Sequence, residues 1–208
     1  MKKINFGPFL IMIAASLWAF DAVIRTVLSA KIPAASVVLF EHIIGFIFLI
    51  PFFIKGIQSY KKLKLKDWGW VVLMTLFNSV LGTTLFTLAL MKSFSVYDFV
   101  TPLLLQKLQP VIVIILSAIF LKEKLSWKFL LMIPLVLIGS YMVGFSAEPV
   151  SFSLQGKEEV ALLALGAAFF WGSGIILNKI VLKKLSFTES ISIRFLLAIP
   201  FSFIFPLL

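Results

Sequence analysis

Residues 14–25 read AASLWAFDAVIR, an apolar run that contains one acidic and one basic residue. Steps of three and four residues return to the same face of an α-helix. One stripe of such a helix carries Ala14, Trp18, Asp21 and Arg25. The small and aromatic part of this run recurs as AAFFWGSG at residues 167–174. We therefore expect two related helical segments in one chain, of which only the first carries the Asp–Arg pair.

The composition predicts that lipid surrounds most of the chain. Hydrophobic residues make up 61% of the 208 residues and charged residues only 13%, which is more apolar surface than a soluble domain can bury. The net charge of +10 does not indicate nucleic acid, because the basic residues lie mainly in short loops between apolar runs. The chain has no cysteine, one histidine and no glycine-rich phosphate-binding motif. We therefore expect no disulfide, metal site, cofactor or nucleic-acid partner.

Seven apolar runs are long enough to cross a bilayer, which takes about 20 residues. Each is expected to be an α-helix, because lipid offers no partner for unpaired backbone groups. The expected spans are residues 8–30, 33–54, 68–90, 98–121, 127–145, 160–182 and 187–207. Lysines gather in alternate loops, most densely at residues 55–66. The positive-inside rule then places the N-terminus in the cytoplasm and predicts a multi-pass protein of the inner (cytoplasmic) membrane.

The most polar stretch, residues 146–159, divides the chain into two parts and is expected to be an extracytoplasmic linker. Residues 1–145 hold five expected spans, an odd number. A second copy that begins at residue 160 must therefore lie upside down in the membrane, and residues 160–208 supply two helices of it.

Internal similarity supports this division. Aligning Trp18 with Trp171 also places Glu41 opposite Arg194. Inverted repeats of this kind are typical of secondary transporters, whose substrate site lies where the repeats meet. The alternative is a chance match between two apolar helices.

Several motifs in a fixed order resemble a known family. They are LWAF (residues 17–20) with its echo FFWGSG (169–174), the pair Ile32-Pro33 at the start of a span, and LLLQKLQPVIVIILSAIFLKEKLS at residues 103–126. In this order the chain resembles the EamA-domain transporters of the drug/metabolite transporter superfamily. The resemblance implies ten helices in two inverted five-helix repeats that move small metabolites. On that basis we expect a truncated ten-helix fold in which three helices are missing, with Asp21 in place of the usual small residue.

Charged residues inside the expected spans are the first candidates for a site. They are Asp21, Arg25, Glu41, Lys107 and Arg194. A charge at the bilayer centre costs about 2.5–3.5 kcal/mol, so these residues should pair with one another or face a water-filled cavity. One interpretation makes them the wall of a substrate cavity, in which Lys107 or Arg194 meets a carboxylate. The other is structural, with an Asp21–Arg25 ion pair and a Glu41–Lys107 clamp between helices.

Polar and aromatic residues of the same spans complete the predicted cavity, although interhelical hydrogen bonding and packing are their alternative roles. The predicted substrate-binding set is Trp18, Asp21, Arg25, Glu41, Asn78, Gln106, Lys107, Gln109, Trp171, Asn178 and Arg194. Ser79 and Thr83 are further candidates for the same wall, whereas His42 is expected to point elsewhere on its helix. Pro102, Pro110 and Pro134 are expected to kink their helices, one of them near Lys107.

From the residues and the resemblance together, we expect a permease that moves a small metabolite out of the cell by alternating access. Its partners would be the substrate and the lipid bilayer, with a homodimer left open. A truncated or non-transporting membrane subunit is the first alternative. A polytopic membrane enzyme is the second, and the chain lacks the serine–histidine or aspartate pair that it would need. If Lys107 contacts the substrate, its replacement by Ala should abolish transport.

Overall fold

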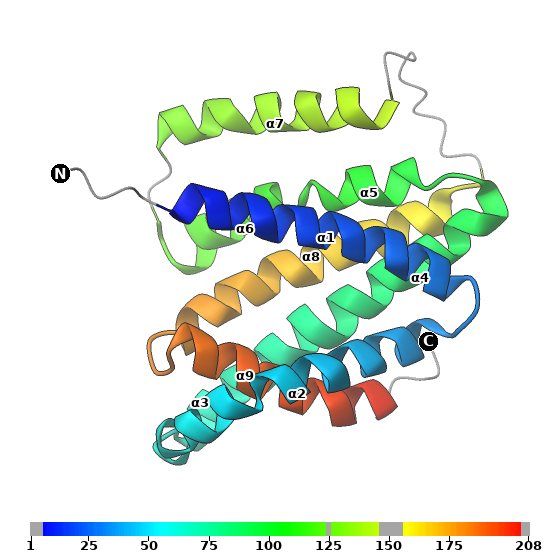
Figure 1. Ribbon diagram of the computed structural model, residues 1–208. Coiled ribbons are helices and arrows are strands. Elements are labelled where there is room, and N and C mark those ends of the chain that lie inside the picture. Colours follow the sequence, from blue (N-terminus) through cyan, green and yellow to red (C-terminus); the bar gives the residue numbers. More distant parts are fainter. Residues whose placement is uncertain (1–5, 124–125, 146–155, 205–208) are drawn as a thin grey trace.

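Helices form the whole of the described architecture, which in the computed structural model covers residues 6–123, 126–145 and 156–204 and contains no strand (Figure 1). In chain order these are α1 (Gly7–Ser29), α2 (Ala34–Lys61), α3 (Leu65–Thr75), the π-helical segment η1 (Leu76–Leu81), α4 (Gly82–Val96), α5 (Val100–Gln106), α6 (Gln109–Phe120), α7 (Trp127–Phe145), α8 (Glu158–Val181) and α9 (Phe187–Ile204). The predicted all-α fold is confirmed.

Several of these helices suit a bilayer. Five helical units are long and apolar enough to cross a membrane: α1, α2, α3 to α4 through η1, α5 with α6, and α8. The protein is therefore a polytopic membrane protein. Helices α7 and α9 coincide with the other two expected spans, but a total of seven crossings stays a prediction. So does the division at the linker, since residues 146–155 lie outside the described part of the chain.

Helix α8 lies at the centre of the bundle. It packs against α3, η1 and α4 and also against α5 and α6, while α2 packs mainly against α9 (Figure 1). Small residues allow this central position, because Ala164, Ala167 and Ala168 are completely buried and a side chain on Gly172 would meet Ile112 at 2.9 Å. In Figure 1, α1 and α8 run in opposite directions, and so do α2 and α9.

Ion pairs tie both ends of α8 to its neighbours. At one end Lys157 Nζ lies 2.7 Å from an Asp98 oxygen, and Glu159 lies 2.9 Å from Lys92. At the other end Lys179 contacts Glu123 at 3.0 Å. Asp98 also accepts hydrogen bonds from the backbone N–H groups of Val100 and Thr101 and from the Thr101 hydroxyl, so it caps the start of α5.

Two of the long helical units are interrupted. The π-helical segment η1 separates α3 from α4. The chain also leaves the helix at Lys107 and Leu108, and α6 then begins with Pro110 in its first turn, where its missing N–H is not needed. The kink predicted near Lys107 is thus present as a break. Pro102 lies in the first turn of α5, and Pro134 lies inside α7 without ending it.

Candidate functional site

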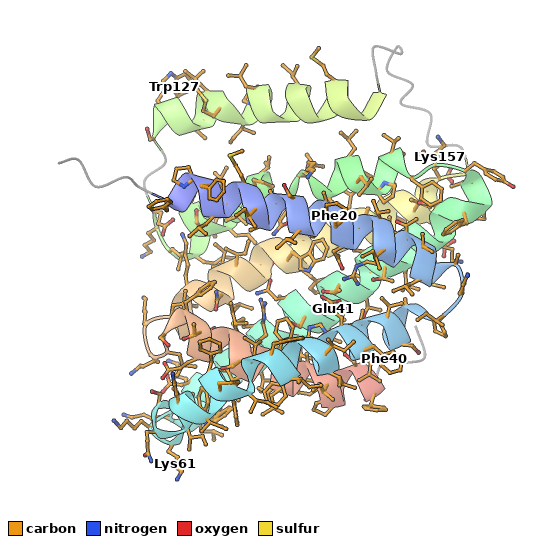
Figure 2. All side chains as sticks on the ribbon, in the orientation of Figure 1. Phe20, Phe40, Glu41, Lys61, Trp127 and Lys157 are labelled. Carbon is orange, nitrogen blue, oxygen red and sulfur yellow. The ribbon has the colours of Figure 1, made fainter. Side chains whose placement is uncertain are left out.

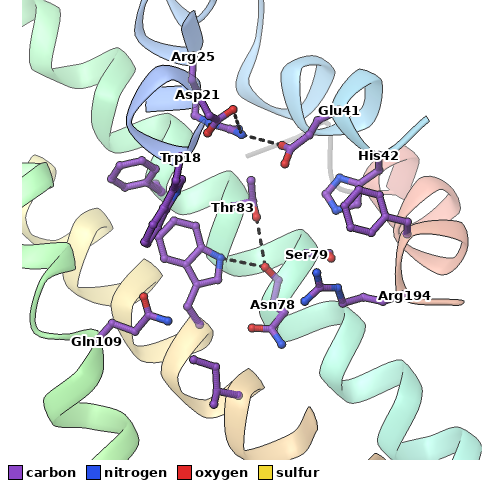
Figure 3. A pocket seen from close by; sticks show the side chains of 14 residues that line it. Trp18, Asp21, Arg25, Glu41, His42, Asn78, Ser79, Thr83, Gln109 and Arg194 are labelled. Carbon is purple, nitrogen blue, oxygen red and sulfur yellow. Dashed lines mark hydrogen bonds and ion pairs between the residues drawn. The ribbon is translucent and has the colours of Figure 1, made fainter. Parts of the chain in front are cut away.

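A cavity of about 380 Å³ lies between α1, α2, α8, α9, the start of α6 and the middle of the α3–η1–α4 unit. Its size falls within the range of about 300–1,000 Å³ that is usual for small-molecule sites. Its lining mixes ionised, amide, hydroxyl and aromatic side chains (Figure 3). The lining residues are Trp18, Asp21, Arg25, Glu41, His42, Asn78, Ser79, Thr83, Phe86, Gln109, Trp171, Ile175, Arg194 and Phe195.

Eight of the eleven residues predicted from the sequence lie on this wall. They are Trp18, Asp21, Arg25, Glu41, Asn78, Gln109, Trp171 and Arg194. Six different helical segments supply them, so the fold brings together residues that are far apart in the sequence. That they bind a substrate stays a prediction.

Three predicted residues do not line the cavity. Gln106 is buried at the end of α5, and Asn178 accepts a hydrogen bond of 2.7 Å from the Ser190 hydroxyl of α9. Lys107 lies in the break between α5 and α6 with an exposed side chain, and its Nζ is 5.6 Å from the centroid of the Trp18 ring. Lys107 lies two residues before Gln109, a spacing that places side chains on different faces of a helix, and the turn at residues 107–108 leaves its side chain exposed.

Arg25 is the centre of a buried polar network at one end of the cavity. Only 4% of it is exposed, although α1 itself is largely exposed. Its Nε and Nη2 donate to the two oxygens of Asp21, each at 3.1 Å, and Nη2 donates to Glu41 at 2.8 Å. Its Nη1 donates to the Thr87 hydroxyl at 3.1 Å. Arg25 therefore connects α1 to both α2 and α4.

These bonds test the two ion pairs that the structural interpretation of the sequence predicted. The Asp21–Arg25 ion pair predicted from the spacing of four residues is present. The expected clamp between Glu41 and Lys107 is wrong, because Glu41 pairs with Arg25 instead. The carboxylates of Asp21 and Glu41 keep 41% and 36% of their side-chain surface exposed, so both still reach the cavity.

Two tryptophans from the aligned segments meet in the wall. The Trp18 and Trp171 rings lie 6.3 Å apart in an edge-to-face arrangement, which favours the positive edge of one ring against the face of the other. The Trp171 Nε1 donates to the backbone oxygen of Asn78 at 2.9 Å (Figure 3). This oxygen belongs to η1, and π-helical turns often accompany functional sites because they redirect such groups. A side chain on Gly82 would come within 2.5 Å of the Trp171 ring.

A histidine and a phenylalanine that the sequence reasoning missed line the opposite side. His42 was expected to point elsewhere, but it is buried in the wall and donates from Nδ1 to the Val38 carbonyl at 2.7 Å. Its ring contacts the Phe195 ring with the centroids 4.8 Å apart and the planes tilted by 40°. The alignment that pairs Trp18 with Trp171 also pairs His42 with Phe195, so this signal could have found both. Phe86 and Ile175, also missed, had no comparable signal.

The charges of the cavity balance but are separated. The two acids, Asp21 and Glu41, match the two bases, Arg25 and Arg194. Arg25 binds both carboxylates, whereas Arg194 lies beside Asn78 and Ser79, away from Asp21 (Figure 3). The site is thus neutral as a whole, with an acidic side and a basic side. Among the described residues no cluster of three or more His, Cys, Asp or Glu could hold a metal ion.

Comparison with known proteins gives the family. The riboflavin transporter ImpX of Fusobacterium nucleatum subsp. nucleatum (strain ATCC 23726 / VPI 4351) is 34% identical over 194 residues. The match covers 92% of this chain and 64% of the relative, so the chain spans less than two thirds of that protein's length. No solved structure matches the chain. A model of the EamA-like transporter family matches residues 5–145, and the chain therefore belongs to this family of membrane transporters.

Proposed function

We propose that this chain supplies the substrate cavity of a permease for a small, planar heteroaromatic metabolite of the riboflavin class. The single observation that carries the proposal is the cavity of about 380 Å³ whose wall combines the Trp18–Trp171 pair with polar groups. Aromatic side chains offer faces and edges to a planar ring, and a few fixed polar groups then set its orientation. The name of the ImpX relative, a riboflavin transporter, supports the same class of ligand.

Alternating access is the mechanism that the packing supports best. Helices α2 and α9 form one wall of the cavity, and α8 with its neighbours forms another. The ion pairs at both ends of α8 favour movement of that group as a unit, while α1 is held through Arg25. Opening one side while the other closes would expose the cavity to each face of the membrane in turn.

The orientation in the inner membrane rests on the lysines. In Figure 2, Lys61 marks the end of α2 and lies at the opposite end of the bundle from Lys157. The loop that joins α8 to α9 carries Lys183 and Lys184 and lies at the same end as Lys61 (Figure 1). A cytoplasmic position of this end agrees with the positive-inside rule. Outward transport, expected from the sequence, remains part of the proposal.

Transport into proteoliposomes tests the proposal. The protein is purified, reconstituted and supplied with riboflavin on one side of the membrane at a time, and flavin fluorescence reports its appearance on the other. We expect saturable transport above protein-free liposomes, and a loss of about 5- to 150-fold for Trp18→Leu, since stacking on aromatic residues contributes about 1–3 kcal/mol.

Trp127→Leu is the matched control, because Trp127 is 72% exposed on α7 and does not line the cavity. No transport by folded, reconstituted protein in either direction would refute the proposal and favour a non-transporting subunit. Equal losses in the two variants would show that the tryptophan pair does not form the site.

A further inference from the structure

Among the described residues of the cavity wall, Arg194 is the one charged residue with a fully buried polar atom that has no hydrogen-bond partner. Its Nε is buried and, among the described residues, has no hydrogen-bond partner. A buried donor without a partner loses the hydration that it had in water, and proteins seldom keep one unless something else satisfies it. Its guanidinium carbon lies 5.6 Å from the centroid of the Phe195 ring, which gives contact but no acceptor.

The contrast with Arg25 explains why Arg194 has no acidic hydrogen-bond partner among the described residues. Arg25 donates to Asp21, Glu41 and Thr87, and so occupies the carboxylates that would otherwise neutralise Arg194. Figure 3 shows the Arg194 side chain turned toward Asn78, on the side of the pocket away from Asp21. The terminal nitrogens of Arg194, unlike its fully buried Nε, are therefore the donors that remain available to whatever fills the cavity.

The aromatic neighbours hold Arg194 in this place. The Phe195 ring contacts His42 in a tilted arrangement, and a side chain on Gly45 would overlap the Phe195 ring. The missing side chain of Gly45 leaves room for the Phe195 ring beside Arg194. This ring then restricts where the Arg194 guanidinium can lie. A positioned donor needs no reordering when a ligand arrives, and this favours affinity.

We propose, on the basis of the proposed function, that Arg194 binds the substrate by donating to an uncharged carbonyl oxygen of its ring, and that the site rejects the phosphorylated form. The hydroxyl chain of a riboflavin-like ligand then points to Asp21 and Glu41, whose exposed oxygens accept from hydroxyl groups. A phosphate on the end of that chain would place negative charge beside two carboxylates in a cavity that is already neutral.

Binding of three flavins to the whole purified protein tests this orientation, with quenching of flavin fluorescence as the measurement. The probes are riboflavin, riboflavin 5′-phosphate and lumiflavin, which lacks the hydroxyl chain. We expect the phosphate to bind about 100-fold more weakly than riboflavin, since an uncompensated charge in the membrane interior is strongly unfavourable. Lumiflavin should bind between the two, because it keeps the ring carbonyls and loses only the contacts with the carboxylates.

Variants then separate the two ends of the cavity. Arg194→Gln should weaken both riboflavin and lumiflavin by about 10- to 100-fold, because each loses a hydrogen bond to a charged donor. Glu41→Gln removes one negative charge from the other end and should narrow the gap between riboflavin and its phosphate by about tenfold. Lys179→Gln carries the same charge change as Arg194→Gln at the far end of α8 and should leave all three affinities as they are.

Two results would overturn the inference while leaving the proposed function intact. One is riboflavin binding by Arg194→Gln that equals the wild type, and the other is equal binding of riboflavin and its phosphate by the wild-type protein. The second comparison needs no variant, so it decides the matter even if Arg194→Gln does not fold. Absence of riboflavin binding by folded wild-type protein would instead refute the proposed function itself.

Discussion

Replacing Arg25 by Met should destabilise the bundle more than any other single charge removal described above. The substitution keeps an unbranched side chain of similar reach but removes the four hydrogen bonds to Asp21, Glu41 and Thr87. Two of these bonds, to Glu41 and Thr87, join different helices and at an average of about 0.6 kcal/mol give about 1.2 kcal/mol, and the i,i+4 pair with Asp21 within α1 adds about 0.3–0.5 kcal/mol. Breaking a fully buried ion pair costs about 3–5 kcal/mol.

The exposure of the two carboxylates favours a loss of stability between these two values, nearer to the smaller one. The orphaned carboxylates keep 41% and 36% of their side-chain surface exposed, so water in the cavity can solvate them after Arg25 is removed. We therefore expect the free energy of unfolding to fall by about 2–3 kcal/mol. The measurement is an unfolding titration with sodium dodecyl sulfate in mild detergent micelles, followed by circular dichroism.

Lys92→Met provides the matched control. Lys92 and Glu159 form an ion pair of similar length, but their side chains are 49% and 64% exposed, and such surface pairs contribute about 0–1 kcal/mol. If Arg25→Met and Lys92→Met lower the stability by the same small amount, then the Arg25 network does not hold α1 to the bundle and the reasoning from burial fails.

Three further outcomes follow from single contacts. Gly82→Ala places a methyl group 2.5 Å from the Trp171 ring and should lower the free energy of unfolding by about 1–3 kcal/mol, whereas Gly69→Ala, with no atom within 4 Å, should not lower it in the same titration. Burial raises the pKa of Asp98, but hydrogen bonds from a lysine and a threonine outweigh it and hold this pKa below its usual value. The stabilisation by Asp98 is therefore present above the ordinary carboxyl pKa of about 3.9 and is lost as the pH falls through the lowered value, so an acid titration should destabilise the wild type more than Asp98→Asn. Lys107→Ala removes a cation–π contact of about 0.5–1 kcal/mol and should lower transport by less than tenfold, and complete loss of transport would return Lys107 to the site.

The helices could be predicted from the sequence because the bilayer allows few alternatives. A run of about 20 apolar residues in lipid has to satisfy its own backbone, and a helix does so locally. Helix α1, for example, begins at Gly7 and ends at Ser29, close to the predicted range of 8–30. The breaks were harder to predict because each depends on one or two residues. Pro110 indicated a break near Lys107, but the sequence did not show that the break leaves the Lys107 side chain exposed.

The site was partly predictable for a different reason. Ionised groups inside an apolar span must face something polar, which is why Asp21, Arg25 and Glu41 were found from the sequence and do share one wall. That rule did not predict which charged residues pair, since Glu41 of α2 pairs with Arg25 of α1 and not with Lys107. Uncharged wall residues such as Phe86 carry no comparable signature, because most apolar residues of the chain could equally face lipid or a neighbour.

The π-helical segment η1 sets the phase between the two ends of one long helix. A π turn holds one more residue than an α-helical path of the same length, and each residue of an α-helix advances the face by about 100°. Winding all of Leu76–Leu81 as regular α-helix, with no residue deleted, would therefore rotate α4 relative to α3 by about that angle. Thr87 would turn away from Arg25, while Met74 would stay in its core position. The π turn thus absorbs one residue, so that α3 can keep Met74 in the core while α4 directs Thr87 toward the site.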